Sequence, residues 1–175
     1  MCDNGKQLDA SKFTCEDSGG LSSTPCTNVI DGDESTVWAS GLNSIVNAQE
    51  RFIDGKVQWG FNTSIKVILD KETIVSSVQI TNKADQKDFY ENYKTMKLQF
   101  SNGYEKIIKL GNGKMNEPWL LENPLRTSYI NFVGITTWGQ MPDDHLHLPF
   151  PDHTGFRSGL SEIRLYGCDE DIESK

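Results

Sequence analysis

The chain has 175 residues, 36% of them hydrophobic, which suits one globular domain built around a single core. Its 17 basic and 25 acidic residues give a formal net charge of -8. This acidic balance argues against nucleic-acid binding and against non-specific adhesion to anionic membranes, because both select for clustered lysine and arginine. No apolar run approaches the roughly 18 residues that a membrane-spanning helix needs.

The cysteines indicate an oxidising compartment. They are Cys2, Cys15, Cys26 and Cys168. Their spacings fit no zinc-binding pattern, because the sequence contains no C-x-x-C pair. Four cysteines allow three connectivities. We favour Cys2–Cys168, which would tie the two ends of the domain together, and Cys15–Cys26. The alternative is four free thiols in a cytosolic protein.

Two further features bear on secretion. Asn62-Thr63-Ser64 is an N-glycosylation sequon, with Asn62 as the acceptor. Met1 is followed by Cys2-Asp3-Asn4, without the basic and apolar regions of a signal peptide. We therefore expect a secreted or cell-surface protein whose signal peptide has been removed.

The first 25 residues read as an irregular, disulfide-stapled lead-in to the same domain. Residues 26–40 follow with the sequence C-T-N-V-I-D-G-D-E-S-T-V-W-A-S. This stretch combines two carboxylates around a glycine, then a hydroxyl and an aromatic: Asp31, Gly32, Asp33, Thr36 and Trp38. Such a turn offers several oxygens within a few residues, as calcium requires, and the tryptophan can anchor it in a core. A plain surface turn is the alternative, because Asp-Gly is a common turn signal.

An EF-hand is excluded at this stretch. It needs glycine at loop position six and glutamate at position twelve. Counted from Asp31, those positions hold Thr36 and Leu42.

The rest of the chain is dominated by short strands. Residues 41–56 show no sustained helical stripe, and we expect a long loop there. Apolar residues then alternate with polar ones, the mark of half-buried strands, at Ile65/Val67/Leu69, Val78/Ile80, Met96/Leu98/Phe100, Ile130/Phe132 and Ile163/Leu165. Ser101-Asn102-Gly103 is a hairpin turn. The pattern predicts an all-β sandwich or barrel over residues 26–168, followed by a flexible tail at 169–175.

One proline-rich stretch interrupts the strands. Residues 140–156 contain three prolines and all three histidines of the chain. Proline excludes this stretch from a sheet interior, and long inserted loops are more often functional than idle.

Several motifs together carry a family resemblance. They are N-V-I-D-G-D-E-S-T-V-W-A-S, V-Q-W-G, S-I-K-V-I-L-D, T-I-V-S-S-V-Q-I-T-N, M-K-L-Q-F-S-N-G, S-Y-I-N-F-V and G-L-S-E-I-R-L-Y-G-C. In this order the chain resembles the discoidin, or coagulation-factor C-type, domain of the galactose-binding-like superfamily. The resemblance implies an antiparallel jelly-roll β-sandwich of about eight strands.

The resemblance also implies a calcium site that joins the early acidic loop to the last strand. Its ligands here would be the carbonyl of Asn28, the side chain of Asp31, the carbonyl of Asp33, Thr36, Glu162 and the carbonyl of Ser161. The alternative for Glu162 is a solvated carboxylate at a strand edge.

The family binds ligands through loops at one end of the sandwich, which correspond here to residues 43–56, 84–92 and 139–156. Candidate contacts in or beside them are Phe52, Phe89, Tyr90, Trp138, His145, His147, Phe150 and Arg157. Aromatic and polar side chains suit sugar stacking or a protein hot spot, although Trp138 and Phe156 could instead belong to the core. The loops lack the paired apolar spikes with basic support that anionic phospholipid would require.

We therefore predict a non-catalytic extracellular binding or adhesion module that recognises a glycan or a partner protein. One alternative is a self-associating structural adhesion domain. Another is a zinc-dependent enzyme built on Asp143, Asp144, His145, His147, Asp152 and His153. No G-x-S-x-G, H-E-x-x-H or P-loop motif is present. The sequence leaves the ligand and the oligomeric state open.

Overall fold

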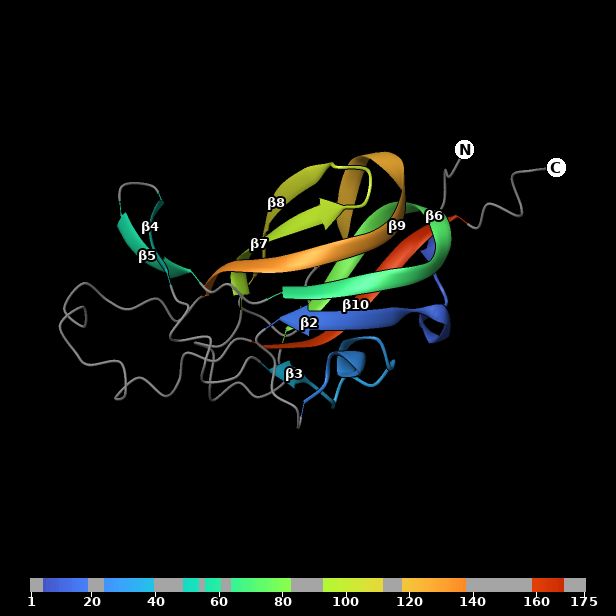
Figure 1. The fold of residues 1–175 in the computed structure, drawn as a ribbon, viewed down its shortest axis with the longest axis horizontal. Coiled ribbons are helices and arrows are strands. Elements are labelled where there is room, and N and C mark those ends of the chain that lie inside the picture. Colours follow the sequence, from blue (N-terminus) through green and yellow to red (C-terminus); the bar gives the residue numbers. More distant parts are fainter. Residues whose placement is uncertain are drawn as a thin grey trace.

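The structure is a computed structural model that describes residues 5–18, 24–39, 49–53, 56–60, 64–82, 93–111, 118–137 and 159–168. Within these ranges the chain forms strands and two short 3-10 helices but no α-helix (Figure 1). The strands are β1 Lys6–Gln7, β2 Thr14–Ser18, β3 Trp38–Ala39, β4 Gln49–Ile53, β5 Lys56–Gly60, β6 Ser64–Asn82, β7 Tyr93–Phe100, β8 Glu105–Lys109, β9 Trp119–Thr137 and β10 Gly159–Cys168. The 3-10 helices are η1 Ala10–Lys12 and η2 Cys26–Val29. No helix in this described part is long and apolar enough to cross a bilayer.

Eight of the strands form one antiparallel sheet that folds over on itself. Its main path runs β1-β10-β6-β9-β7-β8, with β2 beside β6 and β3 beside β10. The two 19-residue strands β6 and β9 bend, so each contributes to both layers of a sandwich. The bend in β6 falls at the exposed residues 70–72, where its pairing with β9 breaks between Ile68 and Thr73. The predicted antiparallel β-sandwich is therefore confirmed.

The two layers are defined by the pairings on either side of this bend. The first contains β2, residues 64–68 of β6, the end of β9, β7 and β8. The second contains β1, β3, β10, residues 74–82 of β6 and the start of β9. Figure 1 shows β6 and β9 curving from one layer into the other.

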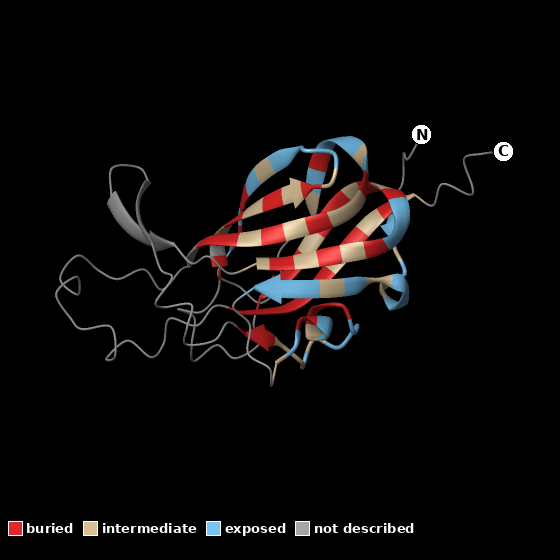
Figure 2. Cartoon of the chain, in the orientation of Figure 1, coloured by how far each residue is buried: buried red, intermediate tan, exposed pale blue. Residues whose placement is uncertain are grey.

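The core lies between the layers and follows the predicted alternation. Ile65, Val67 and Leu69 are buried, whereas Lys66 and Ile68 between them are only half-buried. Figure 2 shows the same alternation of buried and half-buried residues along β6 and β9. The other predicted core residues are also buried, namely Val78, Ile80, Met96, Leu98, Phe100, Ile130, Phe132, Ile163 and Leu165. Each such side chain contributes about 1.5–3 kcal/mol when it leaves water, so this shared core holds the layers together.

The predicted turn at residues 101–103 connects β7 to β8. Gly103 has a φ of +92°, which favours glycine, and its amide donates to the carbonyl of Phe100 at 3.0 Å. The alternation of apolar residues along β7 and the turn signal at residues 101–103 thus both predicted this hairpin correctly.

The expectation of a long loop over residues 41–56 is wrong for part of that range. β4 pairs with β5 as a two-stranded hairpin, with Ile53 opposite Lys56, and Figure 1 shows it projecting from one end of the sandwich. The missed signal is Asp54-Gly55 between the two strands, because Asp-Gly strongly favours a two-residue hairpin connection. Residues 41–48 lie outside the described residues.

The segment expected to be an irregular lead-in contains β1 and β2, both of which belong to the main sheet. Lys6 lies opposite Gly167 of β10, and Thr14 lies opposite Ile68 of β6. Phe13 and Cys15 pack against the core, which explains why so short and polar a segment forms a strand. The first and last described residues consequently lie together, at the end of the sandwich away from β4 and β5 (Figure 1).

Candidate functional site

The acidic loop between η2 and β3 is held by buried residues on both sides. Val29 and Ile30 are buried before it, and the Trp38 side chain after it is 1% exposed. Gly32 has a φ of +79°, which allows the chain to reverse at the exposed tip. Trp38 thus anchors the loop in the core, as its position in the sequence predicts.

Two aspartates shape the loop through bonds to backbone amides. Asp31 Oδ1 accepts from the amide of Asp33 at 2.8 Å. Asp33 Oδ1 accepts from the amide of Ser35 at 2.9 Å and from its hydroxyl at 2.6 Å. The Ser35 hydroxyl, and then the Ser35 amide, lower the pKa of Asp33. Asp33 Oδ1 is therefore engaged in the turn, while the carbonyl oxygen of Asp33 accepts from the amide of Thr36 at 3.3 Å and from its hydroxyl at 2.9 Å.

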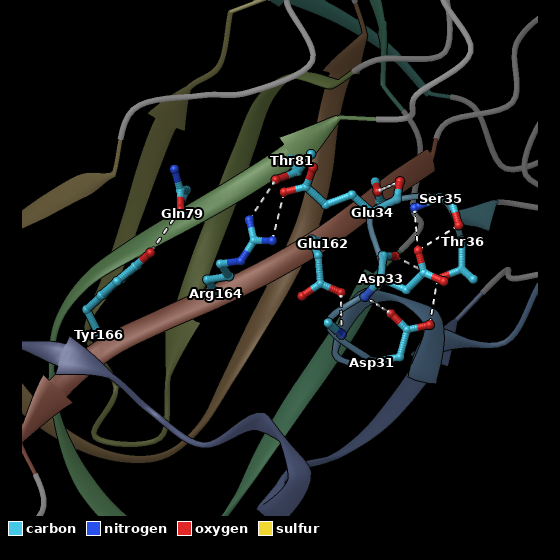
Figure 3. Close-up of polar contacts among 12 residues, drawn as sticks. Asp31, Asp33, Glu34, Ser35, Thr36, Gln79, Thr81, Glu162, Arg164 and Tyr166 are labelled. Carbon is cyan, nitrogen blue, oxygen red and sulfur yellow. Dashed lines mark hydrogen bonds and ion pairs between the residues drawn. The ribbon is translucent and has the colours of Figure 1, made fainter.

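The hydroxyl of Thr36 lies at the centre of a cluster of oxygens. It is 2.6 Å from Asp31 Oδ2, 2.9 Å from the carbonyl oxygen of Asp33 and 3.2 Å from that of Asn28 (Figure 3). One hydroxyl carries one proton and can fully satisfy only one of these acceptors at a time. The structure thus brings together four of the predicted cation ligands.

The last strand supplies a buried carboxylate to the same loop. Glu162 of β10 is 2% exposed, and its Oε1 accepts from the amide of Gly32 at 3.0 Å. The alternative of a solvated strand-edge carboxylate is therefore wrong. Burial raises the pKa of Glu162 to about 7; the Gly32 amide and Arg164 oppose this shift, and Asp31 adds to it. A positive charge placed here would offset both the burial and the repulsion between Asp31 and Glu162.

Two residues that the sequence interpretation missed also fasten the loop to β10. Glu34 forms an ion pair with Arg164 at 2.8 Å, and its carbonyl accepts from the hydroxyl of Ser161 at 2.5 Å. Arg164 also reaches the Thr81 hydroxyl of β6 at 3.5 Å. The available signal was the spacing of Glu162 and Arg164, which places both on the same face of an alternating strand. The Ser161 carbonyl stays a predicted ligand, and the Ser161 hydroxyl makes the contact with the loop.

The donor set fits calcium better than zinc. Among the described residues, no three His, Cys, Asp or Glu side chains gather into a metal-binding group. The side-chain carboxylates here are those of Asp31 and Glu162, supplemented by carbonyl and hydroxyl oxygens. Calcium accepts such mixed oxygen ligands, whereas zinc prefers nitrogen and sulfur.

Most of the predicted ligand contacts fall outside the described residues: Phe89, Tyr90, Trp138, His145, His147, Phe150 and Arg157. The same holds for the Asp/His loop at 143–153, for Phe156 and for Asn62. Phe52 lies in β4, of which the backbone is described.

The described strand ends nevertheless show where these loops attach. Asn82 at the end of β6 lies opposite Leu160, and Tyr93 lies opposite Thr137. Ala39 lies opposite Gly159. The connections after Ala39, Asn82 and Thr137 therefore leave the sandwich at the same end, beside the acidic loop.

The structure joins Cys15 and Cys26 in a disulfide. Cys168 is also disulfide-bonded, and its predicted partner Cys2 lies outside the described residues. None of the described cysteines is a free thiol, so the alternative of four free thiols is wrong.

No protein-family model and no curated protein matches this chain. Solved structures do match over nearly its full length. The family 32 carbohydrate-binding module of NanJ from C. perfringens, in complex with galactose, is similar with a TM-score of 0.66 at 17% identity, covering 93% of this chain and 99% of that one. An F5/8 type C domain from Bacteroides fragilis is similar with a TM-score of 0.64 at 16% identity, covering 94% and 97%.

The chain has the discoidin-like fold. The family resemblance drawn from the motifs is confirmed at this level. A third similar structure is a Clostridium perfringens module from a family 89 enzyme in complex with GalNAc-beta-1,3-galactose, with a TM-score of 0.63 at 12% identity, covering 91% of this chain and 99% of that one. At identities this low, structural similarity shows the fold alone, and function has to be argued from the site.

Proposed function

We propose that this chain is a non-catalytic, extracellular carbohydrate-binding module. The observation that carries the proposal is the near-complete match, over both chains, to a module solved with galactose. A second similar module was solved with a disaccharide of GalNAc and galactose. Galactose-type termini are therefore the first ligands to test.

The binding surface is the end of the sandwich from which three connections leave together, after Ala39, Asn82 and Thr137. Loops clustered at one end of a rigid scaffold can present aromatic and polar side chains to a sugar without disturbing the core. The aromatic and histidine residues predicted as contacts belong to these connections in sequence.

Calcium is the proposed structural cofactor of the module. Asp31, Thr36 and Glu162, with the carbonyls of Asn28 and Asp33, would hold it. The ion would add positive charge between the two carboxylates and would join the acidic loop to β10. Extracellular modules bind calcium with dissociation constants of order 10⁻⁴–10⁻³ M, which matches calcium levels outside cells.

Secretion accounts for the disulfides. Cys15–Cys26 is formed and Cys168 is disulfide-bonded, as expected in an oxidising compartment. The proposed partner is thus a glycan outside the cell.

A glycan array with the purified chain in millimolar calcium tests the function. We expect binding to glycans that end in galactose or N-acetylgalactosamine. Calorimetric titration with the sugars that bind on the array then measures their affinity. Absence of binding to every glycan, together with specific capture of a surface protein, would contradict the proposal and favour the protein-binding alternative.

A further inference from the structure

An aspartate on β2 lies on the same face of the sheet as buried residues of β6, although the residue itself is exposed. Residues opposite each other in an antiparallel pair share a face of the sheet. Cys15 lies opposite the buried Val67, and Asp17 lies opposite the buried Ile65. Asp17 therefore lies on the core-facing side of β2, whereas Glu16 between them lies on the other side.

The carboxylate of Asp17 has a specific partner in that position. Trp38 Nε1 donates to Asp17 Oδ2 at 2.7 Å, and the Trp38 residue is 1% exposed. A buried indole N–H needs an acceptor, and an ionised acceptor forms a shorter and stronger bond. Asp17 thus satisfies the residue that anchors the end of the acidic loop.

The beginning of the same loop is also attached to β2. Cys15, two positions before Asp17, forms the disulfide with Cys26 at the start of η2. The segment from Cys26 to Trp38, which contains Asn28, Asp31, Asp33 and Thr36, is therefore held at both ends by one face of one strand. β2 belongs to the first layer through its pairing with β6.

The other side of the loop is attached to the second layer. Trp38 pairs with Leu160 of β10, two residues before Glu162. The loop therefore spans the two layers, and the Asp17–Trp38 bond links the end of the loop, paired with β10, to β2 in the first layer.

We propose that Asp17 is a positioning residue for the acidic loop: with the Cys15–Cys26 disulfide it holds both ends of the segment so that its oxygens meet Glu162. The proposal rests on the cation site of the proposed function. Asp17 does not bind the ion; it acts through Trp38.

The test compares Asp17→Ala with Glu16→Ala, the neighbouring acid on the opposite face of β2. Calcium affinity is measured by calorimetry, and the melting temperature is measured in EDTA and in millimolar calcium. Loss of a residue that orients a metal ligand typically weakens metal affinity 10–100-fold. Asp17 is one contact further from the ion, so we expect about tenfold weaker calcium binding in D17A. E16A should bind as the wild type does. Asp17→Asn retains an acceptor oxygen and should recover most of the affinity.

A merely structural role gives a different result. D17A would then melt at a lower temperature by the same amount with and without calcium, and its calcium affinity would be unchanged, which overturns the proposal. Trp38→Phe provides a second check, because it removes the N–H. If Asp17 acts through Trp38, adding D17A to W38F changes calcium affinity no further.

Amide hydrogen exchange in EDTA separates this proposal from the proposed calcium site. The amides of Gly32, Asp33, Ser35 and Thr36 donate to loop and β10 acceptors. They should exchange several-fold faster in D17A than in E16A. If the wild type binds no calcium, the proposed cofactor is wrong, and the exchange rates still decide whether Asp17 positions the loop. Equal rates in D17A and E16A would overturn the positioning role.

Discussion

The amide of Gly32 donates a 3.0 Å hydrogen bond to the buried carboxylate of Glu162, although 130 positions separate the two residues in sequence. This bond brings the acidic loop onto the last strand. It also places Glu162 beside Asp31, whose carboxyl contributes to the raised pKa of Glu162. Two carboxyls held together with one of them buried create a need for a positive charge, and this need is the physical basis of the proposed cation site.

Replacing Glu162 with glutamine should remove the stabilisation by calcium. The amide oxygen of the introduced glutamine can still accept from Gly32, so the variant should fold, but the charge that attracts the ion is lost. We expect millimolar calcium to raise the melting temperature of the wild type and to leave E162Q unchanged. Glu122→Gln on the exposed part of β9 is the matched control and should respond as the wild type does. A full calcium response in E162Q would exclude this residue as a ligand.

The metal-free protein should lose stability as the pH rises towards neutrality. The pKa of Glu162 is raised from 4.5 to about 7 in the folded state, so the folded protein binds this proton more tightly than the unfolded chain does. The resulting stabilisation is complete below pH 4.5 and is lost as the pH rises through 7, up to a loss of about 3 kcal/mol. Urea unfolding in EDTA at pH 5 and pH 8 measures it. The wild type should lose more stability over this interval than E162Q, and equal losses would contradict the assignment.

Removing the Cys15–Cys26 disulfide should destabilise the chain. The two cysteines are 11 positions apart, and the loop-entropy model gives about 3 kcal/mol for closing a loop of this length. Urea unfolding of the C15A/C26A double variant in EDTA tests this value. The double replacement is preferable to a reducing agent, which would also attack the disulfide of Cys168. Unchanged unfolding would show that β2 and η2 hold together without the covalent bond.

Replacing Gly134 with alanine should destabilise the first layer. A Cβ at this position would overlap the ring of Tyr93, which is fully buried opposite the end of β9. Overpacking of this kind costs about 1–3 kcal/mol. Thermal and urea unfolding measure the change, with Leu120→Ala as the control, because that side chain is 74% exposed and its loss should cost less than about 0.5 kcal/mol. A G134A protein as stable as the control would mean that Tyr93 moves aside freely.

The strands of the core could be predicted because their signal is local. Alternation at Ile65, Val67 and Leu69 reports which face of a strand is buried, whatever the strand pairs with. The β4–β5 hairpin was missed because the apolar residues of β4, Phe52 and Ile53, are adjacent and do not alternate, although Asp54-Gly55 carried a turn signal. β1 and β2 were missed because short polar strands gain their stability from the sheet that they join.

By itself the amino-acid sequence determined the class of fold, the position of the acidic turn and, through family motifs, the expectation that this turn meets Glu162. Only the tertiary structure decided that Glu162 is buried, that Glu34 pairs with Arg164 and that Asp17 accepts from Trp38. Burial and charge pairing depend on which strands lie next to each other, and that arrangement arises when β6 and β9 bend and close the sandwich. The spacing of residues along one strand shows which side chains share a face but not what lies against that face, because the partners come from segments up to 130 positions away.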